Sequence, residues 1–349
     1  MPTMTGAQAL VSSLVAEGVD TVFAVPGYQA MNAFDALFEA RDRIRTVHTR
    51  HEQATTFMAD GYAKATGSVG VAMVVPGPGA LYATAGLSTA FASSSPVLLV
   101  SCQVPSTVIG RRLGHLHEID DQLEAMRPVT KWAYRVARVD EIPGAVHEAI
   151  RRMTTSRPRP VELEVPMDFL EELSGAEIPL AETYPHQAAD PSEIKRAAEV
   201  LVSAERVTII AGGGATISGA SASLLQVAEF LQAPVVTTED SKGIIPEDHP
   251  LSAGAHYYGL GLAFDLFLDT DALLAVGTRM FLDELEQLSF TADQKIVQID
   301  IDPSELGKAY PVEVGIVGDA GEVLDSLLLA LRELTPERPS RGDEFVRRR

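Results

Sequence analysis

The stretch Val47-His-Thr-Arg-His51-Glu52-Gln-Ala-Thr-Thr-Phe57-Met58-Ala-Asp-Gly-Tyr62-Ala-Lys-Ala65-Thr-Gly67 joins a β-rich run to a helical pattern. Apolar or small residues have the i, i+3, i+4, i+7 spacing of a helix with one buried face: Ala54, Phe57, Met58, Gly61, Tyr62 and Ala65. Gly67 is expected to end this helix. Glu52 would then lie just past the carboxyl end of a strand, where open α/β sheets bind ligands. An acidic residue in a first helical turn also suits the helix dipole, so spacing alone leaves a structural role for Glu52 open.

Strand and helix patterns alternate on both sides of this stretch. Strands are expected at residues 21–25, 44–49, 69–75, 97–101 and 161–165. Helices are expected at residues 5–17 and 29–39, from Glu52 to Gly67, from the turn at 76–79 to about 93, and near 141–154, whereas residues 103–133 look less regular. This alternation predicts that residues 1–172 form a domain whose parallel sheet is covered by helices on both faces.

A second α/β unit is expected in residues 191–335. Its predicted strands are 207–211, 234–237, 272–276 and 296–301, with helices near 192–203, 219–231 and 320–333. Residues 173–190 have the proline and polar content of a linker, and residues 336–349 read as a polar tail or the start of another linker. The predicted fold class is α/β, with two doubly wound parallel-sheet domains, the second of them Rossmann-like.

The composition favours a soluble protein that handles small molecules. The longest apolar runs, such as residues 96–100, are far shorter than a membrane span of about 20 residues, and the first ten residues lack the pattern of a secretory signal. A formal net charge of −20 disfavours nucleic acid and anionic membranes as partners. Cys102 is the single cysteine, which excludes an internal disulfide and suits a reducing cytoplasm.

The segment from Arg50 to Gly67 resembles the pyrimidine-binding domain of thiamine-diphosphate enzymes, in the group of acetohydroxyacid (acetolactate) synthases and 2-keto acid decarboxylases. The resemblance rests on the residues Arg-His-Glu-Gln and Phe-Met-Ala-Asp-Gly-Tyr-Ala-Lys-Ala-Thr-Gly. It extends over about residues 5–330. It implies that Glu52 hydrogen-bonds the aminopyrimidine ring of thiamine diphosphate and favours the tautomer that removes the C2 proton of the thiazolium. That role needs a carboxyl group shielded from water.

The resemblance also implies site roles for two turns and two side chains of the first domain. Pro26-Gly27 and Pro76-Gly77 follow predicted strands. Gly77 and Gly79 let the backbone approach a ligand closely, although turn geometry alone would also explain them. Tyr82 stands where the synthases carry asparagine. Gln103 matches the glutamine that faces the cofactor in the synthases.

His115 and His117 partly resemble the paired histidines that α-keto acid decarboxylases place near the thiazolium as proton relays. Histidines titrate near neutral pH, so they can both donate and accept a proton, although two histidines in a polar loop also suit solvated residues. The Phe-Gln-Glu of the synthases is replaced here by Leu116-His117-Glu118. This difference is expected on the substrate side of the site.

The second domain resembles the central domain of the same family through Lys242-Gly243, Gly277-Thr-Arg279, Ile299-Asp-Ile-Asp302-Pro303 and Val317-Gly-Asp319-Ala320. In relatives this domain binds FAD, ADP or nothing, and the segments of the FAD-binding members are altered here at residues 255–259 and 277–283. The three glycines after the first strand look like a phosphate-binding turn, but Ile217 breaks the dinucleotide fingerprint. The candidate nucleotide-binding residues are Gly212, Gly213, Gly214, Arg279, Asp300 and Asp302.

The Gly-Asp-Gly and Asn-Asn motif by which the family holds Mg²⁺ and the diphosphate does not occur in this sequence, whose single asparagine is Asn32. No metal ligand is therefore assigned, and the metal site is expected in a separate domain or chain. The leading hypothesis is a component of a thiamine-diphosphate-dependent 2-keto acid decarboxylase or carboligase, truncated or split, that is inactive alone. The alternative is a non-catalytic binding or regulatory subunit. Expected partners are a small 2-keto acid, a diphosphate-binding domain or subunit, and a second copy in a homodimer.

Overall fold

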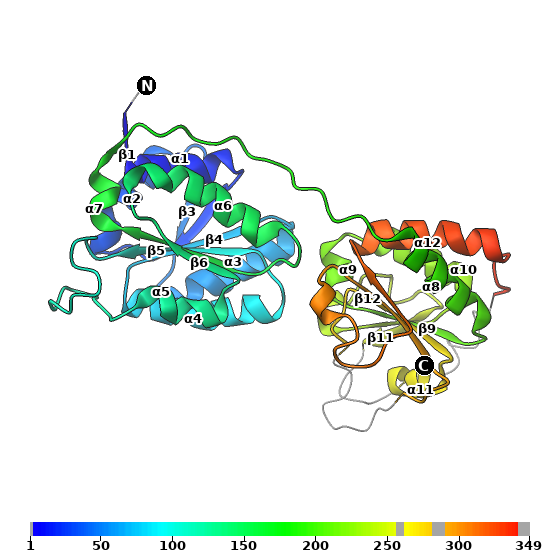
Figure 1. Ribbon diagram of the computed structural model, residues 1–349. Coiled ribbons are helices and arrows are strands. Elements are labelled where there is room, and N and C mark those ends of the chain that lie inside the picture. Colours follow the sequence, from blue (N-terminus) through cyan, green and yellow to red (C-terminus); the bar gives the residue numbers. More distant parts are fainter. Residues whose placement is uncertain (1–2, 256–261, 281–289, 341–349) are drawn as a thin grey trace. The chain divides into compact units, whose positions relative to one another are not determined.

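The computed structural model describes residues 3–255, 262–280 and 290–340 (Figure 1). The chain divides into two compact units, Met1–Tyr184 and Pro185–Arg349. The boundary between them in the sequence falls within the segment predicted as a linker. Each unit contains a six-stranded sheet whose paired strands are all parallel. The predicted fold class, two α/β domains with parallel sheets, is confirmed.

The sheet of unit 1 places strands from distant parts of the chain side by side. Its order is β3 (Arg45–His48), β2 (Thr21–Ala24), β4 (Gly70–Val74), β5 (Val97–Gln103), β7 (Val161–Pro166) and β6 (Trp132–Arg135). Every residue of β2, β4, β5 and β7 is buried, whereas the edge strands β3 and β6 are partly exposed. The inner strands are mostly apolar because a parallel sheet is covered on both faces.

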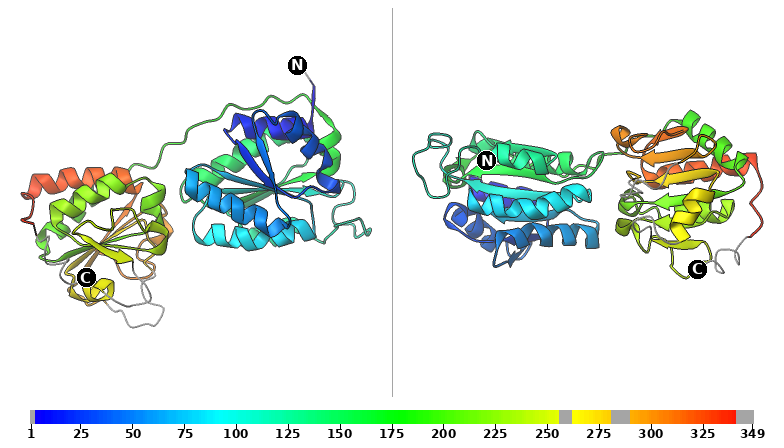
Figure 2. Two further views of the ribbon diagram at one scale, coloured as in Figure 1. Left: turned by 180° about the vertical axis from the view of Figure 1, so that it is seen from behind. Right: turned by 90° about the horizontal axis from the view of Figure 1, so that it is seen from below.

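Helices cover both faces of this sheet (Figures 1 and 2). One face packs against α1 (Gly6–Ala16), α2 (Met31–Glu39) and α6 (Ile142–Thr154), and the other against α3 (Glu52–Thr66), α4 (Pro78–Ala92) and α5 (Gln122–Met126). An antiparallel pair of β1 (Met4–Thr5) and β8 (Leu173–Ser174) ties the two ends of the unit together. The shorter elements are η1 (Tyr28–Ala30), η2 (Arg127–Val129), η3 (Val139–Glu141) and α7 (Met167–Glu171).

The boundaries of α3 follow the prediction, but its predicted buried face is wrong. The helix starts at Glu52, and Gly67 closes it with a left-handed φ of 70°. The residues that pack inward are Thr55, Thr56, Ala59, Asp60 and Ala63, whereas Phe57 and Met58 are exposed. Thr56 can face the interior because its hydroxyl donates to the carbonyl of Ala83 on α4 at 2.9 Å. The apolar stripe of α3 therefore points away from its own sheet.

Unit 2 repeats the same architecture. Its sheet order is β11 (Ser252–Ala255), β10 (Val235–Thr237), β9 (Val207–Ala211), β12 (Ala272–Val276), β13 (Lys295–Asp300) and β14 (Val314–Val317). Helices α8 (Pro191–Ser203), α10 (Ser221–Leu231) and α12 (Ala320–Leu334) pack together on one face, and α11 (Leu262–Asp269) lies on the other (Figure 1). The short elements are α9 (Gly213–Ile217), η4 (Glu239–Ser241) and η5 (Pro303–Glu305).

The structure adds elements that the patterns did not predict. Strands β6, β11 and β14 and helices α5 and α11 are new, and α5 and the start of β6 lie in the segment expected to be irregular. Parts of three expectations lie outside the described residues, namely the altered segments within 255–259 and 277–283 and most of the predicted tail. Among the described helices, none is both long and apolar enough to cross a membrane.

Candidate active site

Four neighbouring strands of unit 1 bring the predicted site residues to one edge of the sheet. Strands β3, β2, β4 and β5 are parallel, so their carboxyl ends lie together. Glu52 follows β3, Pro26-Gly27 follows β2, Pro76-Gly77 follows β4, and Gln103 ends β5. The chain runs from β2 outward to β3 and then returns to β4 on the other side of β2. The carboxyl ends of the adjacent strands β2 and β4 are therefore a topological switch point, where open α/β sheets bind ligands.

Val75 packs against the Pro26-Gly27 turn and the start of α4, and it explains one glycine in each. A Cβ atom on Gly27 would lie 2.5 Å from Cγ1 of Val75, and one on Gly79 would lie 2.8 Å from Cγ2. Val75 is buried, so neither clash could be relieved without disturbing the core. The turn and the helix start are thus pressed together by packing that only glycine permits.

Glu52 lies at the start of α3 beside the start of α4. Its side chain is partly buried, and its Cγ is 3.7 Å from the position that a Cβ on Gly79 would take. His51 caps α3, since its Nδ1 accepts the N–H of Gln53 at 3.2 Å. The His51 ring in turn lies 4.7 Å from the exposed ring of Tyr82 on α4. The predicted residues Glu52 and Tyr82 therefore border the same pair of helix starts.

The loop after β5 reaches the Pro76-Gly77 turn through His117. A Cβ on Gly77 would lie 2.3 Å from the carbonyl oxygen of His117, and Gly77 has a φ of 59° that favours glycine. His117 itself has a φ of 69°, which is uncommon for a residue with a side chain. Its Nδ1 lies 3.1 Å from Oε1 of Gln29, while Nε2 of Gln29 donates to the carbonyl of Leu116 at 2.8 Å. Gln29, which the sequence analysis missed, therefore holds this loop against the turns.

His115 is exposed, and its described hydrogen bonds run through its backbone to Glu118. The N–H groups of His115 and Leu113 donate to the Glu118 carboxylate at 3.0 and 3.2 Å. These backbone donors, with that of His115 foremost, lower the pKa of Glu118 below its usual range. Glu118 therefore organises the loop as an ionised carboxylate. The described contacts bring His117, rather than the side chain of His115, to the Pro-Gly turns.

Gln103 is buried and bound within the sheet. Its Nε2 donates to Oε1 of Glu164 at 2.5 Å, and its Oε1 accepts the N–H of Val104 at 2.7 Å. Glu164 also forms an ion pair with Arg135, at 2.6 Å between Nε and Oε1. Burial raises the pKa of the neighbouring Cys102 thiol to about 12, so this thiol stays protonated at neutral pH. Cys102 therefore packs as a small apolar residue.

Unit 2 has its own switch point between β9 and β12. Gly212, Gly213 and Gly214 follow β9 there, beside Gly277 after β12. The N–H of Gly212 donates to the carbonyl of Val276 at 2.9 Å, and that of Gly214 donates to the carbonyl of Gly277 at 2.9 Å. A Cβ on Gly212 would lie 2.5 Å from the same Gly277 oxygen. The turn thus uses two of its N–H groups to join the strands rather than to face a phosphate.

The other predicted nucleotide residues lie around the carboxyl end of β13. Asp300 is buried and its Oδ1 accepts the N–H of Asp302 at 2.9 Å, while Asp302 caps η5 through the N–H of Ser304 at 3.0 Å. Arg279 is exposed just after β12. Both aspartates therefore have structural roles in their own loop.

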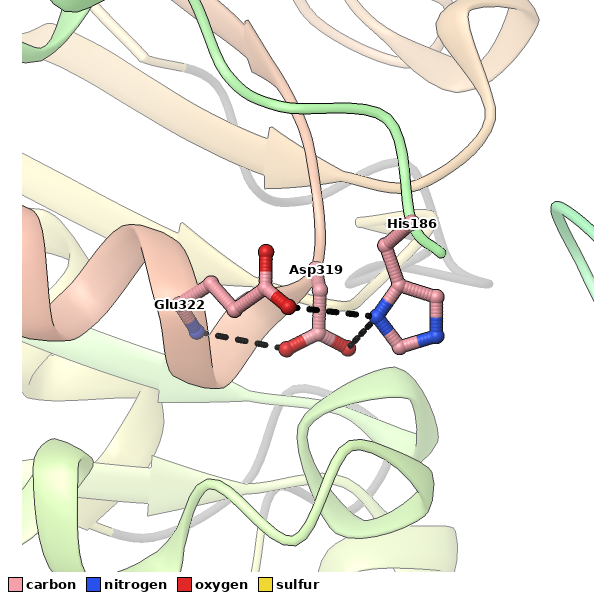
Figure 3. Close-up of side chains that lie close together, drawn as sticks. All are labelled: His186, Asp319 and Glu322. Atoms are coloured by element: carbon pink, nitrogen blue, oxygen red, sulfur yellow. Dashed lines mark hydrogen bonds and ion pairs between the residues drawn. The ribbon is translucent and has the colours of Figure 1, made fainter. Parts of the chain in front are cut away.

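A cluster of possible metal ligands lies at the start of α12 (Figure 3). Among the described residues, His186, Asp319 and Glu322 each offer a ligand atom, and these atoms lie within 4.8 Å of one another. Nδ1 of His186 lies 3.5 Å from Oδ2 of Asp319 and 3.6 Å from Oε1 of Glu322. The other Asp319 oxygen caps α12 by accepting the N–H groups of Gly321 and Glu322 at 3.0 and 3.2 Å. Helix capping and ion pairing account for this geometry without a metal.

The fold and its two switch points define a chain with two candidate ligand-binding units of the open α/β type. The family described as "Thiamine pyrophosphate enzyme, N-terminal TPP binding domain" matches residues 4–125, and "Thiamine pyrophosphate enzyme, central domain" matches residues 194–327. The chain belongs to the thiamine pyrophosphate enzymes.

Curated relatives align with nearly the whole chain. A "Probable acetolactate synthase large subunit" of Methanocaldococcus jannaschii is 40% identical over 94% of the chain and 56% of its own length. A "Probable 2-ketoarginine decarboxylase AruI" of Pseudomonas aeruginosa is 35% identical over 94% of the chain and 58% of its own length. The Escherichia coli K12 "Acetolactate synthase isozyme 3 large subunit" is 33% identical over 97% and 60%. The chain therefore spans a little more than half the length of these relatives.

Proposed function

We propose that this chain is a component of a thiamine-diphosphate-dependent 2-keto acid decarboxylase or carboligase, in which unit 1 supplies the pyrimidine site. The observation that carries the proposal is the convergence of Glu52, Pro26-Gly27 and Pro76-Gly77 around the switch point of the first sheet. Relatives named as acetolactate synthases and a 2-ketoarginine decarboxylase support a keto acid substrate.

The residues at this edge fit the cofactor. The glycines let the two turns pack closely, Gly27 against Val75 and Gly77 against His117, and Glu52 brings a partly buried carboxyl group to the same end of the sheet. Thiamine diphosphate, when bound, supplies the electron sink for decarboxylation. Glu52 would bind the aminopyrimidine and exchange a proton with it, while Tyr82 and His117 would face the substrate. We assign the contacts to Mg²⁺ and the diphosphate to a domain or chain other than these units.

Turnover of a 2-keto acid tests this proposal. The chain would be mixed with a diphosphate-binding domain or subunit, Mg²⁺ and thiamine diphosphate, and carbon dioxide release would be measured with and without the cofactor. We expect cofactor-dependent release that Glu52→Gln reduces by at least about a hundredfold, the scale of a lost general acid–base group. Glu39→Gln, on the exposed end of α2, is the matched control and should retain activity.

The second candidate function is a non-catalytic binding or regulatory subunit of a split enzyme. The exposed Tyr82 and the loop at Leu116-His117 favour it, because both differ from synthase positions on the substrate side. In that case the chain should alter the turnover of an enzyme that is complete without it. Glu52→Gln should then leave turnover unchanged, which separates the two candidates in the same assay.

We also propose that unit 2, if it retains an adenine-nucleotide site, binds FAD or ADP at Gly213 and the exposed Arg279 beside the switch point. The N–H groups of Gly212 and Gly214 are bonded to the neighbouring strand, so this turn offers fewer donors than an open phosphate loop. Calorimetry with each nucleotide tests this. A yellow protein or a measurable heat of binding supports a site, and colourless protein with no heat supports a structural role.

We propose a homodimer, formed through the outward stripe of α3 and the neighbouring α4, working in a reducing cytoplasm. Phe57, Met58, Leu81 and Tyr82 are between 39% and 53% exposed on these two helices. Large apolar side chains grouped on neighbouring helices are typical of an association surface. The buried free Cys102 suits a reducing compartment.

A further inference from the structure

A chain of buried polar side chains leads from the interior of the first sheet toward the proposed cofactor site. Glu162 on β7 and Ser101 on β5 are both fully buried. The hydroxyl of Ser101 donates to Oε1 of Glu162, whereas Oε2 of Glu162 has no hydrogen-bond partner in the described part of the chain. A buried carboxyl group with one unpaired oxygen is costly in an apolar core and calls for a functional explanation.

Gln122 extends this chain to the backbone of the Pro76-Gly77 turn. It is the first residue of α5 and is fully buried. Its Nε2 donates to the hydroxyl oxygen of Ser101 at 3.1 Å, and its Oε1 accepts the N–H of Gly77 at 2.7 Å. Three side chains from three elements thus end on one N–H group at the site.

The Gly77 turn in turn packs against His117 in the loop after β5. The carbonyl oxygen of His117 lies so near Gly77 that a Cβ there would be 2.3 Å away, and His117 is held in the left-handed region. A non-glycine residue in that conformation persists only where its surroundings fix it. Gln29 holds the other side of the loop through Leu116.

The surroundings of Glu162 favour its neutral, protonated form, which can stay buried. Burial first, and then the neighbouring Glu164 carboxylate, raise the pKa of Glu162 well above its usual range, while Ser101 and Arg135 oppose this shift. Glu164 pairs with Arg135 and accepts a hydrogen bond from Gln103, so the guanidinium lies against Glu164 rather than Glu162. A neutral Glu162 can stay buried beside it.

We propose that Gln122, anchored through Ser101 to Glu162, is a positioning residue that fixes the Gly77 turn and with it His117. This inference rests on the proposed function of the surrounding site. Gln122, Ser101 and Glu162 would not touch the reacting atoms. They would place His117, which the proposed function puts on the substrate side. The backbone hydrogen bond to Gly77 is the step on which the placement depends.

Hydrogen exchange of the Gly77 amide, followed by NMR on the full chain without cofactor, tests the proposal. Gln122→Leu removes the acceptor, and we expect the Gly77 amide to exchange about tenfold faster, with shifted His117 backbone resonances. The Leu99 amide in the same sheet should change little, which distinguishes local loosening from global destabilisation. Ser101→Ala should act in the same direction with a smaller effect, and it replaces Gln122→Leu if that variant does not fold.

Gln298→Leu is the matched control. Gln298 is also buried and also accepts a glycine N–H, that of Gly307 at 2.9 Å, but it lies in unit 2. It should leave Gly77 and His117 unchanged. Equal acceleration at Gly77 and Leu99, or no change at Gly77 in a folded variant, would overturn the proposal. Because the experiment needs no cofactor, its outcome is independent of the turnover assay, which alone decides the proposed function.

Discussion

Glu162 and Glu164 show how position on one strand gives two identical side chains different electrostatic surroundings. Both are fully buried on β7, two residues apart and hence on the same face. Glu164 receives Arg135 and Gln103, whereas Glu162 receives the neutral Ser101. The guanidinium lies against Glu164, whereas burial and the neighbouring Glu164 raise the pKa of Glu162.

This difference predicts a pH dependence of stability. Folding raises the pKa of Glu162, so the folded state holds its proton more tightly, and the stability it contributes below the unfolded pKa is lost as pH rises toward the folded pKa. Glu162→Gln cannot ionise. We therefore expect the unfolding free energy of the variant to rise relative to the wild type as the pH rises above the usual glutamate pKa of about 4.3. Urea denaturation at several pH values measures this, and a constant difference would show that Glu162 is ionised in the folded protein.

At this scale the sequence predicted residues whose role follows from local pattern. Glu52 stands at a visible change from strand to helix, and Gly77 stands in a Pro-Gly turn. Gln29 and Gln122 could not be found this way, because Gln122 bonds a backbone group 45 positions away and Gln29 meets His117 over 88 positions. Glu162 reads as an ordinary alternating strand residue, and only the fold reveals its burial.

The α3 and α4 pair forms the wall of the site at the scale of elements. The two helices approach closely at Gly86, where a Cβ would lie 2.3 Å from Oγ1 of Thr56 and 2.7 Å from the backbone nitrogen of Phe57. The absence of a side chain at Gly86 thus sets the spacing of the helices that carry Glu52 and Tyr82.

Substitutions at two helical glycines test this close approach. Gly86→Ala should destabilise unit 1 by about 1–3 kcal/mol, because the added methyl group meets backbone that cannot move. Gly144→Ala on α6 is the control, since a Cβ there has no atom within 4 Å, and it should stabilise by about 0.5–1 kcal/mol through helix propensity. Thermal unfolding monitored by circular dichroism compares them. Similar effects at both positions would mean that the helices tolerate separation.

Buried elements with a clear apolar pattern were predictable, whereas several elements with a weak or interrupted pattern were not. The central strands read as apolar runs, since both faces are covered, and their predicted ranges differ from the observed ones by a few residues. β11 is Ser-Ala-Gly-Ala and has weak strand propensity, whereas β14 is a four-residue strand whose β-branched residues are interrupted by Gly315. Both strands pair with a neighbour in the sheet. The inward face of α3 was mispredicted because its threonines are paired with backbone carbonyls and its apolar stripe is exposed.

The two units share one organising feature at the scale of the whole molecule. Each sheet has a switch point, and in each the predicted ligand residues follow the strands beside it. The first is bordered by a partly buried carboxyl group and bare glycine turns, and the second by glycines whose N–H groups are mostly bonded within the sheet. We therefore expect the chemistry to take place at the first switch point rather than at the second.

We expect the whole molecule to form a homodimer. The outward stripe of α3 should be covered in a homodimer, and the chain should bind thiamine diphosphate weakly or not at all by itself, because the diphosphate anchor is absent from it. Light scattering measures the first and titration calorimetry the second. Phe57→Glu places a charge in the proposed interface and should yield monomers that remain folded. A wild-type monomer, or micromolar binding by the isolated chain, would contradict this account.

In the proposed site, Glu52 is the carboxyl group that exchanges a proton with thiamine diphosphate. The most direct measurement is the rate at which the C2 proton of thiamine diphosphate exchanges with deuterium, followed by NMR in the presence of the chain and a diphosphate-binding partner. We predict rapid exchange with the wild type and a loss of at least about a hundredfold with Glu52→Gln, while cofactor binding changes little. Equal exchange rates for the two proteins would show that Glu52 takes no part in the proton exchange.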